Sequence, residues 1–336
     1  MTSNEVTKSF MEIGGYFGLD LPDIGDLYPE AIKLQSARAA IRAVLECNGI
    51  NRVFIPNYIC SSIIKSAIDA GVKVDTYDLD EFLFPKNLPS LLPDQCVLIY
   101  VNYFGLCQHN ITKLLNNISA DKLIIDNSHA LFSKATDALA TIYSPRKFVG
   151  LPDGGLLKAS PLLRIVPPLV EDVGSFERMR YLLTRMAYSA REGYMDFEKA
   201  RISLADSSPL TMSRLTQRLM KSIGWDQVAE SRRVNYSRLA LMLDSINDRK
   251  WICGLTDVPL CYPLTLSGCD MSKIKAKLVE LNVFTATYWL DALPRVEENT
   301  IEDVLINNTL YLPIDQRMDT EQIERLGQLV LGLTGN

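Results

Sequence analysis

The sequence predicts an α/β protein with a mostly parallel sheet in a large domain and a smaller α+β domain at the carboxyl end. Two observations predict this class. Short apolar runs alternate with helical segments between residues 36 and 158, and strands that alternate with helices form parallel sheets. The runs VLIYV (97–101) and KLII (122–125) are almost wholly apolar, which is typical of strands covered on both faces.

Helices and strands follow one another in the first half of the chain. Residues 37–45 (ARAAIRAVL) are rich in helix formers, and residues 61–70 (SSIIKSAIDA) predict a helix with a serine cap that ends at Gly71. Proline and glycine punctuate the segment 144–154, which predicts turns. Strands are predicted at 52–55, 72–77, 97–101, 122–125, 138–143 and 155–158.

The second half of the chain becomes helical and polar beyond about residue 170. Its predicted elements are helices at 213–224 and 226–246, an apolar run at 310–314 and a helix at 320–331. We therefore expect a large domain over residues 1–246 and a small C-terminal domain over residues 247–336.

Composition and charge exclude several classes of protein. The 336 residues include 35 Lys and Arg against 40 Asp and Glu, and this net charge of −5, without a basic stripe, excludes a nucleic-acid binder. No stretch has the roughly 18 uninterrupted apolar residues of a membrane helix, and the amino-terminal residues lack a signal-peptide pattern, so we expect a cytoplasmic protein. The seven cysteines form no C-x-x-C pair and only two histidines are present, so we expect free thiols and no metal site.

Three polar residues are expected where a doubly wound sheet binds ligands, outside the carboxyl ends of its strands. Asp126 follows an apolar strand, Lys147 lies in the turn after the next predicted strand, and Ser36 precedes the first helix. Pyridoxal phosphate needs such a set. A lysine forms the Schiff base, a carboxylate holds the pyridine nitrogen protonated, and helix-end N–H groups bind the phosphate.

The chemistry of this cofactor gives each residue a role. A carboxylate at Asp126 raises the pKa of the ring nitrogen, and the pyridinium accepts the electrons released when a proton leaves the α-carbon of the substrate. Lys147, once displaced as a free amine, shuttles that proton between the substrate carbon and C4′. Taken alone, Asp126, Lys147 and Ser36 also fit plainer roles as a turn former, a surface charge and a helix cap.

Several segments form a recognisable set in chain order. They are LQSARAAI (34–41), IPNYICSSIIKSAIDAG (55–71), VNYFGLC (101–107), LIIDNSHALFS (123–133), YSPRKFVGLPDGGLL (143–157), ESRRVNYSRL (230–239) and LYLPIDQRMDTEQIERL (310–326). Together they resemble the motifs of the DegT/StrS-type sugar aminotransferases, a group of fold type I pyridoxal-phosphate enzymes. The lysine segment and the aspartate segment, at this separation, are the specific part of the resemblance.

The resemblance implies roles around the cofactor ring. Lys147 matches the lysine that holds the cofactor, and Asp126 matches the carboxylate at its ring nitrogen. His129 stands where the family has a glutamine that bonds the phenolic oxygen, and an imidazole N–H can make the same bond. A hydrogen-bonded structural histidine is the alternative for this position.

The resemblance also places residues at the phosphate and above the ring. Ser36 and Ala37 match the two residues that hold the phosphate. Tyr58 is our choice for the aromatic side chain over the ring face, with Cys60 as the alternative. The aromatic pair at 288–289 is expected to pack in a core, with a position beside the site as the second interpretation.

Two departures from the family concern the substrate side of the site. Ile142 replaces the serine that binds the phosphate five residues before the lysine, so only Thr141 or Ser144 offers a nearby hydroxyl. Residues 209–212 (PLTM) replace the family's N-Y-R-M segment, which reaches into the site of the neighbouring subunit.

The resemblance implies a homodimer that binds pyridoxal 5′-phosphate. It implies transfer of an amino group from a glutamate-like donor to a keto sugar, nucleotide-linked, in the biosynthesis of polysaccharides or natural products. Related sugar dehydratases have a histidine where Lys147 stands, so the lysine favours aminotransfer over dehydration. A chain that keeps the cofactor only to bind a ligand or regulate a partner is the remaining alternative.

Overall fold

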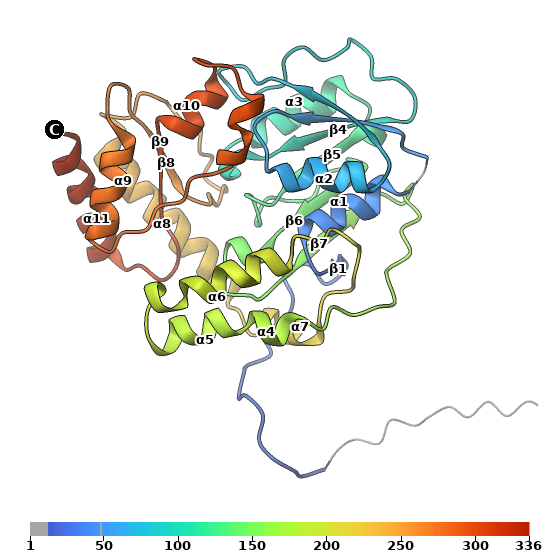
Figure 1. Cartoon of the computed structure of the whole chain (residues 1–336), viewed down its shortest axis with the longest axis horizontal. Coiled ribbons are helices and arrows are strands. Elements are labelled where there is room, and N and C mark those ends of the chain that lie inside the picture. Colours follow the sequence, from blue (N-terminus) through green and yellow to red (C-terminus); the bar gives the residue numbers. More distant parts are fainter. Residues whose placement is uncertain (1–12, 48, 336) are drawn as a thin grey trace, which may run out of the picture.

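The structure, a computed structural model, describes residues 13–47 and 49–335. A seven-stranded sheet forms the centre of its first half (Figure 1). The strands are β1 (Ile32–Leu34), β2 (Arg52–Pro56), β3 (Lys73–Tyr77), β4 (Cys96–Val101), β5 (Leu123–Asn127), β6 (Ala140–Tyr143) and β7 (Gly155–Ala159). Their order is β1-β7-β6-β5-β4-β2-β3. Neighbouring strands from β3 to β6 are parallel, whereas β7 is antiparallel to β6 and β1, so the predicted mostly parallel sheet is confirmed.

Helices α1 (Ala37–Leu45), α2 (Ser61–Asp69) and α3 (Gln108–Asn117) connect strands of this sheet. The hydroxyl of Ser36 caps α1 by accepting a hydrogen bond from the Ala39 amide. The serine cap predicted for α2 is wrong, because Cys60 precedes that helix and makes no side-chain cap bond. Every residue of β4 and β5 is buried, as their apolar sequences predicted.

A helical segment follows the sheet and lies along one side of the molecule (Figure 1). Its helices are α4 (Ser175–Arg178), α5 (Arg180–Ala187), α6 (Ala190–Ser203) and α7 (Arg214–Met220). Helices α5 and α6 pack against each other. None of the residues of α5 is buried, so this helix keeps a large part of its surface open.

The last part of the chain is a separate α+β layer, drawn in orange and red in Figure 1. It contains the antiparallel pair β8 (Tyr262–Thr265) and β9 (Thr309–Leu312), and the helices α9 (Met271–Glu280), α10 (Ile301–Asn307) and α11 (Thr320–Thr334). Helix α8 (Trp225–Leu243) packs against α11 and β8. The expected domain boundary at residue 246 stays a prediction.

A buried charge network, which we call the Asp153 network, joins the helical segment to the start of β7. The Asp153 carboxylate accepts hydrogen bonds from Arg178 Nη2 at 3.1 Å, from Thr216 Oγ1 at 2.5 Å and from the Ser175 hydroxyl. Arg178 also pairs with Asp172, and all of these side chains are buried. Because each charge has a partner, the network fixes α4 and α7 against the sheet.

The elements that the sequence did not predict include β1, α3, β8, α9 and α10. Strand β1 has only three residues and is set by its pairing with β7. Helix α3 (QHNITKLLNN) buries only Asn110, Ile111 and Leu114, so its apolar pattern is weak. Among the helices of the described residues, none is long and apolar enough to cross a membrane.

Candidate active site

The carboxyl ends of β5 and β6, the start of β7 and the start of α1 meet at one edge of the sheet, which we call the Lys147 edge. Asp126 pairs with Ile142 in the parallel register of β5 and β6. The chain then turns through Lys147 and returns at Gly154, whose amide donates to the Gln35 carbonyl at 2.8 Å. The structure thus gathers Asp126, Lys147 and the start of α1 at the edge where the sequence placed them.

A close contact between two backbones holds the start of α1 at this edge. A Cβ atom added at Gly155 would lie 2.2 Å from the carbonyl carbon of Ser36 and 2.5 Å from the amide nitrogen of Ala37. Real side chains do not tolerate such distances, so only glycine fits at the first position of β7. Ser36 is buried there, and its hydroxyl is engaged by the Ala39 amide at 3.2 Å.

Asp126 lies within β5 and not after it, one residue before the strand ends. Its side chain is buried, and Oδ1 accepts a hydrogen bond from the Ser128 amide at 2.8 Å. No donor from the described residues contacts Oδ2. The carboxylate is therefore oriented by one bond and keeps one oxygen for a further donor.

Lys147 ends the short 3₁₀ turn Pro145–Lys147 that follows β6. Its side chain reaches solvent, and its amine makes no hydrogen bond or ion pair with any described residue. Loss of hydration beside the surrounding protein lowers the pKa of Lys147 to about 8, although Asp126 and Cys60 oppose this shift. A lysine with such a pKa is partly neutral near physiological pH and is able to act as a nucleophile or base.

The residue after Lys147 is held by the C-terminal part of the chain. The Phe148 carbonyl accepts hydrogen bonds from Arg232 Nη2 and from Gln316 Nε2, both at 3.0 Å. The buried Arg232 guanidinium lies 4.7 Å from the centre of the Phe148 ring and also donates to the Leu260 carbonyl at 3.0 Å. Arg232 therefore fixes the Lys147 turn, a role that its place in the R-R-x-N motif did not reveal.

His129 lies fully buried beside the same edge. Its imidazole stacks on the Trp289 indole, with ring centroids 4.8 Å apart and an angle of 7° between the rings. Neither ring nitrogen has a hydrogen-bond partner among the described residues. Burial lowers the pKa of His129 well below its usual value, and the charge of Lys147 adds to this effect, so the ring is neutral. The hydrogen-bonded structural histidine considered as the alternative is therefore not what the structure has.

Tyr58 lies in an aromatic cluster and not on an open surface. The side chain is fully buried, its hydroxyl is 2.9 Å from the Tyr311 hydroxyl, and its ring stacks on Tyr103 at a centroid distance of 5.6 Å. Burial raises the pKa of Tyr58. Cys60, the alternative position, is partly exposed and close enough to Lys147 to affect its pKa. The structure thus places Cys60 near Lys147, and it places Tyr58 against Trp289, which stacks on His129.

The position of the missing family serine is filled by a buried apolar side chain. Ile142 is fully buried, and because it pairs with Asp126 its side chain projects from the same face of the sheet as that carboxylate. The neighbouring Thr141 projects from the opposite face, where its hydroxyl is buried without a partner. Of the two hydroxyls considered from the sequence, only that of Ser144 remains.

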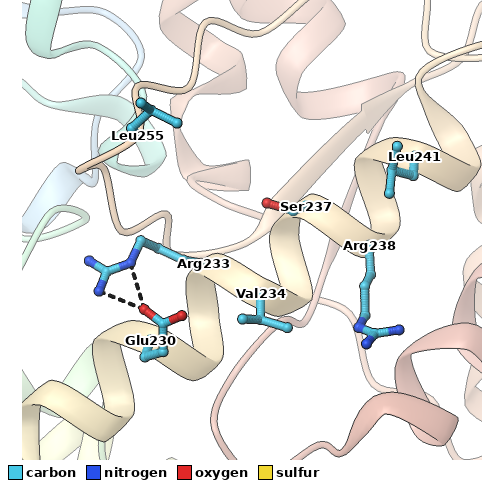
Figure 2. A pocket seen from close by; sticks show the side chains of 7 residues that line it. All are labelled: Glu230, Arg233, Val234, Ser237, Arg238, Leu241 and Leu255. Atoms are coloured by element: carbon cyan, nitrogen blue, oxygen red, sulfur yellow. Dashed lines mark hydrogen bonds and ion pairs between the residues drawn. The ribbon is translucent and has the colours of Figure 1, made fainter.

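A hollow of about 620 Å³ on the solvent-facing side of α8 contains none of the predicted site residues. It is lined by Glu230, Arg233, Val234, Ser237, Arg238, Leu241 and Leu255 (Figure 2). Arg233 pairs with Glu230 at 2.8 Å, and Arg238 pairs with Glu324 at 2.9 Å. The charged groups of this hollow are thus already neutralised, in contrast to Lys147.

No protein-family model matches the sequence, and no curated sequence is similar to it. Solved structures are similar over nearly the whole chain. The sugar aminotransferase CalS13 from Micromonospora echinospora has 11% identity and a TM-score of 0.55, over 92% of this chain and 88% of that one. The aminotransferase TlmJ from Streptoalloteichus hindustanus has 14% identity and a TM-score of 0.58, over 91% and 86%.

A third similar structure is a form with pyridoxal phosphate (PLP). The PLP-form of the putative sugar aminotransferase Spr1654 from Streptococcus pneumoniae has 13% identity and a TM-score of 0.54, over 91% of this chain and 87% of that one. At these identities the likeness concerns the fold. The chain therefore has the fold of the sugar aminotransferases that the resemblance of its motifs indicated.

Proposed function

We propose that the protein is a pyridoxal-phosphate-dependent aminotransferase that transfers an amino group from a glutamate-like donor to a nucleotide-linked keto sugar. The observation that carries this proposal is the unpaired amine of Lys147 at the same edge as the buried carboxylate of Asp126. The fold supports it, because structures with this fold include sugar aminotransferases in the PLP-form and the PMP-form.

The residues at the Lys147 edge fit this cofactor. Within the described part of the chain, Asp126 Oδ2 has no donor and the buried nitrogens of His129 have no partners, as expected where a ring nitrogen and a phenolic oxygen are to be bound. When bound, the cofactor supplies an electron sink for the charge that develops at the substrate carbon. Asp126 would hold the proton of the ring nitrogen, and Ser36 and Ala37 lie at the helix start that would face the phosphate.

Lys147 has two tasks in this proposal: to attach the cofactor and to carry a proton. Both tasks need the neutral amine, and its pKa of about 8 makes a useful fraction neutral at physiological pH. The hydrogen bonds of Arg232 and Gln316 to the next residue keep the turn in place while the lysine side chain moves. Neutral His129 is suited to donate one hydrogen bond and adds no charge that would compete with Asp126.

Absorption spectroscopy tests the proposal. Wild-type protein mixed with pyridoxal phosphate should show a visible band, and glutamate should convert it to the band of the amino form of the cofactor. Lys147→Ala should lose the visible band. Lys158→Ala is the matched control, because Lys158 pairs with Glu30 and its replacement should leave the band unchanged. A wild-type protein without any band would refute the proposal.

A ligand-binding or regulatory role is the second candidate, and Ile142 is the observation that favours it. An apolar side chain stands where the family binds the phosphate through a hydroxyl, and residues 209–212 lack the asparagine and arginine of the family segment. A visible band that no amino donor converts would support this second role. Conversion by glutamate, followed by detection of an aminated nucleotide-linked sugar by mass spectrometry, would exclude it.

We also propose that the protein works as a homodimer in the cytoplasm, with the helical segment as the contact between the two copies. Large apolar side chains are exposed along this segment; they include Leu169, Val173, Phe176, Met186, Tyr188 and Met195. Exposed apolar side chains that gather in one segment are typical of protein–protein contacts. Light scattering should show a dimer for the wild type, whereas Met186→Glu combined with Val173→Glu should shift the mass towards the monomer. A wild-type monomer would contradict the dimer.

A further inference from the structure

Two arginines stand beside Lys147 at the start of α1. Arg38 lies in the first turn of that helix, and Arg146 directly precedes Lys147 in the 3₁₀ turn after β6. Helix α1 packs against β6 and β7, so the two elements that carry the arginines are neighbours. The positive charges of Arg38 and Arg146 also each contribute to the low pKa of Lys147.

These arginines have no acidic partner. The Arg146 side chain makes no hydrogen bond and no ion pair with any described residue. The Arg38 side chain makes one hydrogen bond to the part of the chain that the structure describes, from Nη1 to the Leu204 carbonyl at 2.9 Å. Asp153 is near enough to affect Arg146, but its carboxylate is already occupied in the Asp153 network. Lys147 and the two arginines repel one another, and neither arginine pairs with an acidic side chain among the described residues, so an anion bound between them would relieve this repulsion.

The geometry points to a phosphate group as that anion. We propose that Arg38 and Arg146 bind the phosphate of pyridoxal phosphate at the start of α1. They would take the role of the family's serine hydroxyl, which this chain lacks because Ile142 stands at that position. This inference rests on the proposed function and names residues that neither the motifs nor the fold assigned. A guanidinium offers parallel N–H donors to two phosphate oxygens, and the start of a helix favours negative charge. Arg146 is joined to Lys147 through the backbone, so the turn would hold the cofactor by its aldehyde and its phosphate at once.

The phosphate group can be tested separately from the ring by titrating the protein with pyridoxal phosphate and with pyridoxal, which lacks the phosphate. Binding is followed by absorbance and by quenching of tryptophan fluorescence. We expect Arg146→Met and Arg38→Met each to weaken the binding of pyridoxal phosphate by about tenfold or more, the usual effect of losing a charge-assisted hydrogen bond. Pyridoxal affinity should change by less than about twofold.

Arg201→Met is the matched control for charge alone. Arg201 is exposed, is paired with Glu198 at 2.7 Å, and is close enough to Arg38 to affect its pKa. The Arg201→Met substitution should leave the affinities for pyridoxal phosphate and for pyridoxal unchanged. Arg146→Lys keeps the charge but loses the two-pronged geometry, so it should fall between the wild type and Arg146→Met. Circular dichroism of each variant without cofactor checks that the fold is kept.

The outcomes separate this inference from the proposed function. If the arginine variants bind pyridoxal phosphate as tightly as the wild type, the inference is wrong and the proposed function stands. Equal losses for pyridoxal phosphate and pyridoxal would also overturn it, because the arginines would then act on the ring or on the fold. If the wild type binds neither compound, both the inference and the proposed function fail.

Discussion

The Asp153 network and the Lys147 edge lie close together, but the charged side chains are paired in the first and largely unpaired in the second. In the Asp153 network, Arg178 bonds two carboxylates, and Asp153 accepts from three side chains. At the Lys147 edge, Lys147 and Arg146 have no such partners among residues 13–47 and 49–335, and both nitrogens of His129 are buried there without a hydrogen bond. Both regions contain arginine and aspartate side chains, but these are paired in the Asp153 network and largely unpaired at the Lys147 edge.

This difference separates a structural role from a functional one. Buried charges that are fully paired hold elements together, and breaking one pair leaves another charge stranded. Charges and polar atoms left without partners destabilise the folded chain unless a ligand supplies the missing groups. The comparison therefore predicts that substitutions in the Asp153 network lower the free energy of unfolding, whereas substitutions of the side chains without partners at the Lys147 edge weaken cofactor binding and leave that free energy equal or higher.

The largest effect on stability is expected for Arg178→Met. The change leaves the buried carboxylates of Asp153 and Asp172 without their common cation, which should lower the free energy of unfolding by about 3–5 kcal/mol. Urea denaturation measures this. The control Arg180→Met removes an exposed guanidinium that pairs with Asp196 and should change stability by less than about 1 kcal/mol. Equal effects of the two substitutions would show that the buried Asp153 network contributes no more to stability than an exposed ion pair does.

A smaller loss is expected for Gly155→Ala, at the contact between the two regions. The added methyl group would overlap the Ser36 backbone, so the free energy of unfolding should fall by about 1–3 kcal/mol and the start of α1 should shift. Pyridoxal phosphate should then bind more weakly. Gly332→Ala, in α11, meets no atom within 4 Å and should be neutral or slightly stabilising. Unchanged stability and cofactor binding in Gly155→Ala would show that the contact is not needed.

The smallest effect, of opposite sign, is expected for Lys147→Met without cofactor. The pKa of Lys147 is about 8 in the folded chain, below its ordinary value of 10.5. Below pH 8 the charged amine therefore lowers the free energy of unfolding. Between pH 8 and 10.5 the folded amine is neutral while the unfolded one is protonated, and the stability of the wild type rises relative to the variant. After allowance for solvent screening, we expect Lys147→Met to be more stable by about 1 kcal/mol at pH 7.

Thermal unfolding at pH 7 and pH 10 measures this last prediction, with Lys158→Met as the control. Lys158 is paired with Glu30, so its replacement should not stabilise the chain. A Lys147→Met variant that is less stable than the wild type at pH 7 would contradict the idea that the Lys147 edge is strained without its ligand.

Much of the central sheet could be predicted because its residues carry local signals. The apolar runs of β4 and β5 and the helix formers of α1 gave the order of elements. The turn that holds Lys147 was marked by Pro145 and the glycines that follow it. Weak patterns failed, as in α3, where Asn and Thr stand among few apolar residues.

The site was predictable only in part. Lys147 and Asp126 stand in motifs, but nothing in the local sequence shows that Arg38 and Arg146 approach each other from residues far apart. The same holds for Trp289, which reaches His129 from the C-terminal part of the chain. Tyr58 and Cys60 could not be told apart, because a side chain's direction at the end of a strand depends on what packs against it.

The sequence by itself determined the class of fold and the edge of the sheet where Asp126 and Lys147 lie, and it singled out these two residues as the candidates for the site. These follow from periodicity and from turn residues, which act over a few neighbours along the chain. Only the tertiary structure decided which charges are paired and which are left open, because pairing joins residues from separate elements. For that reason the paired charges of the Asp153 network and the open charges of the Lys147 edge could be distinguished only in the folded structure.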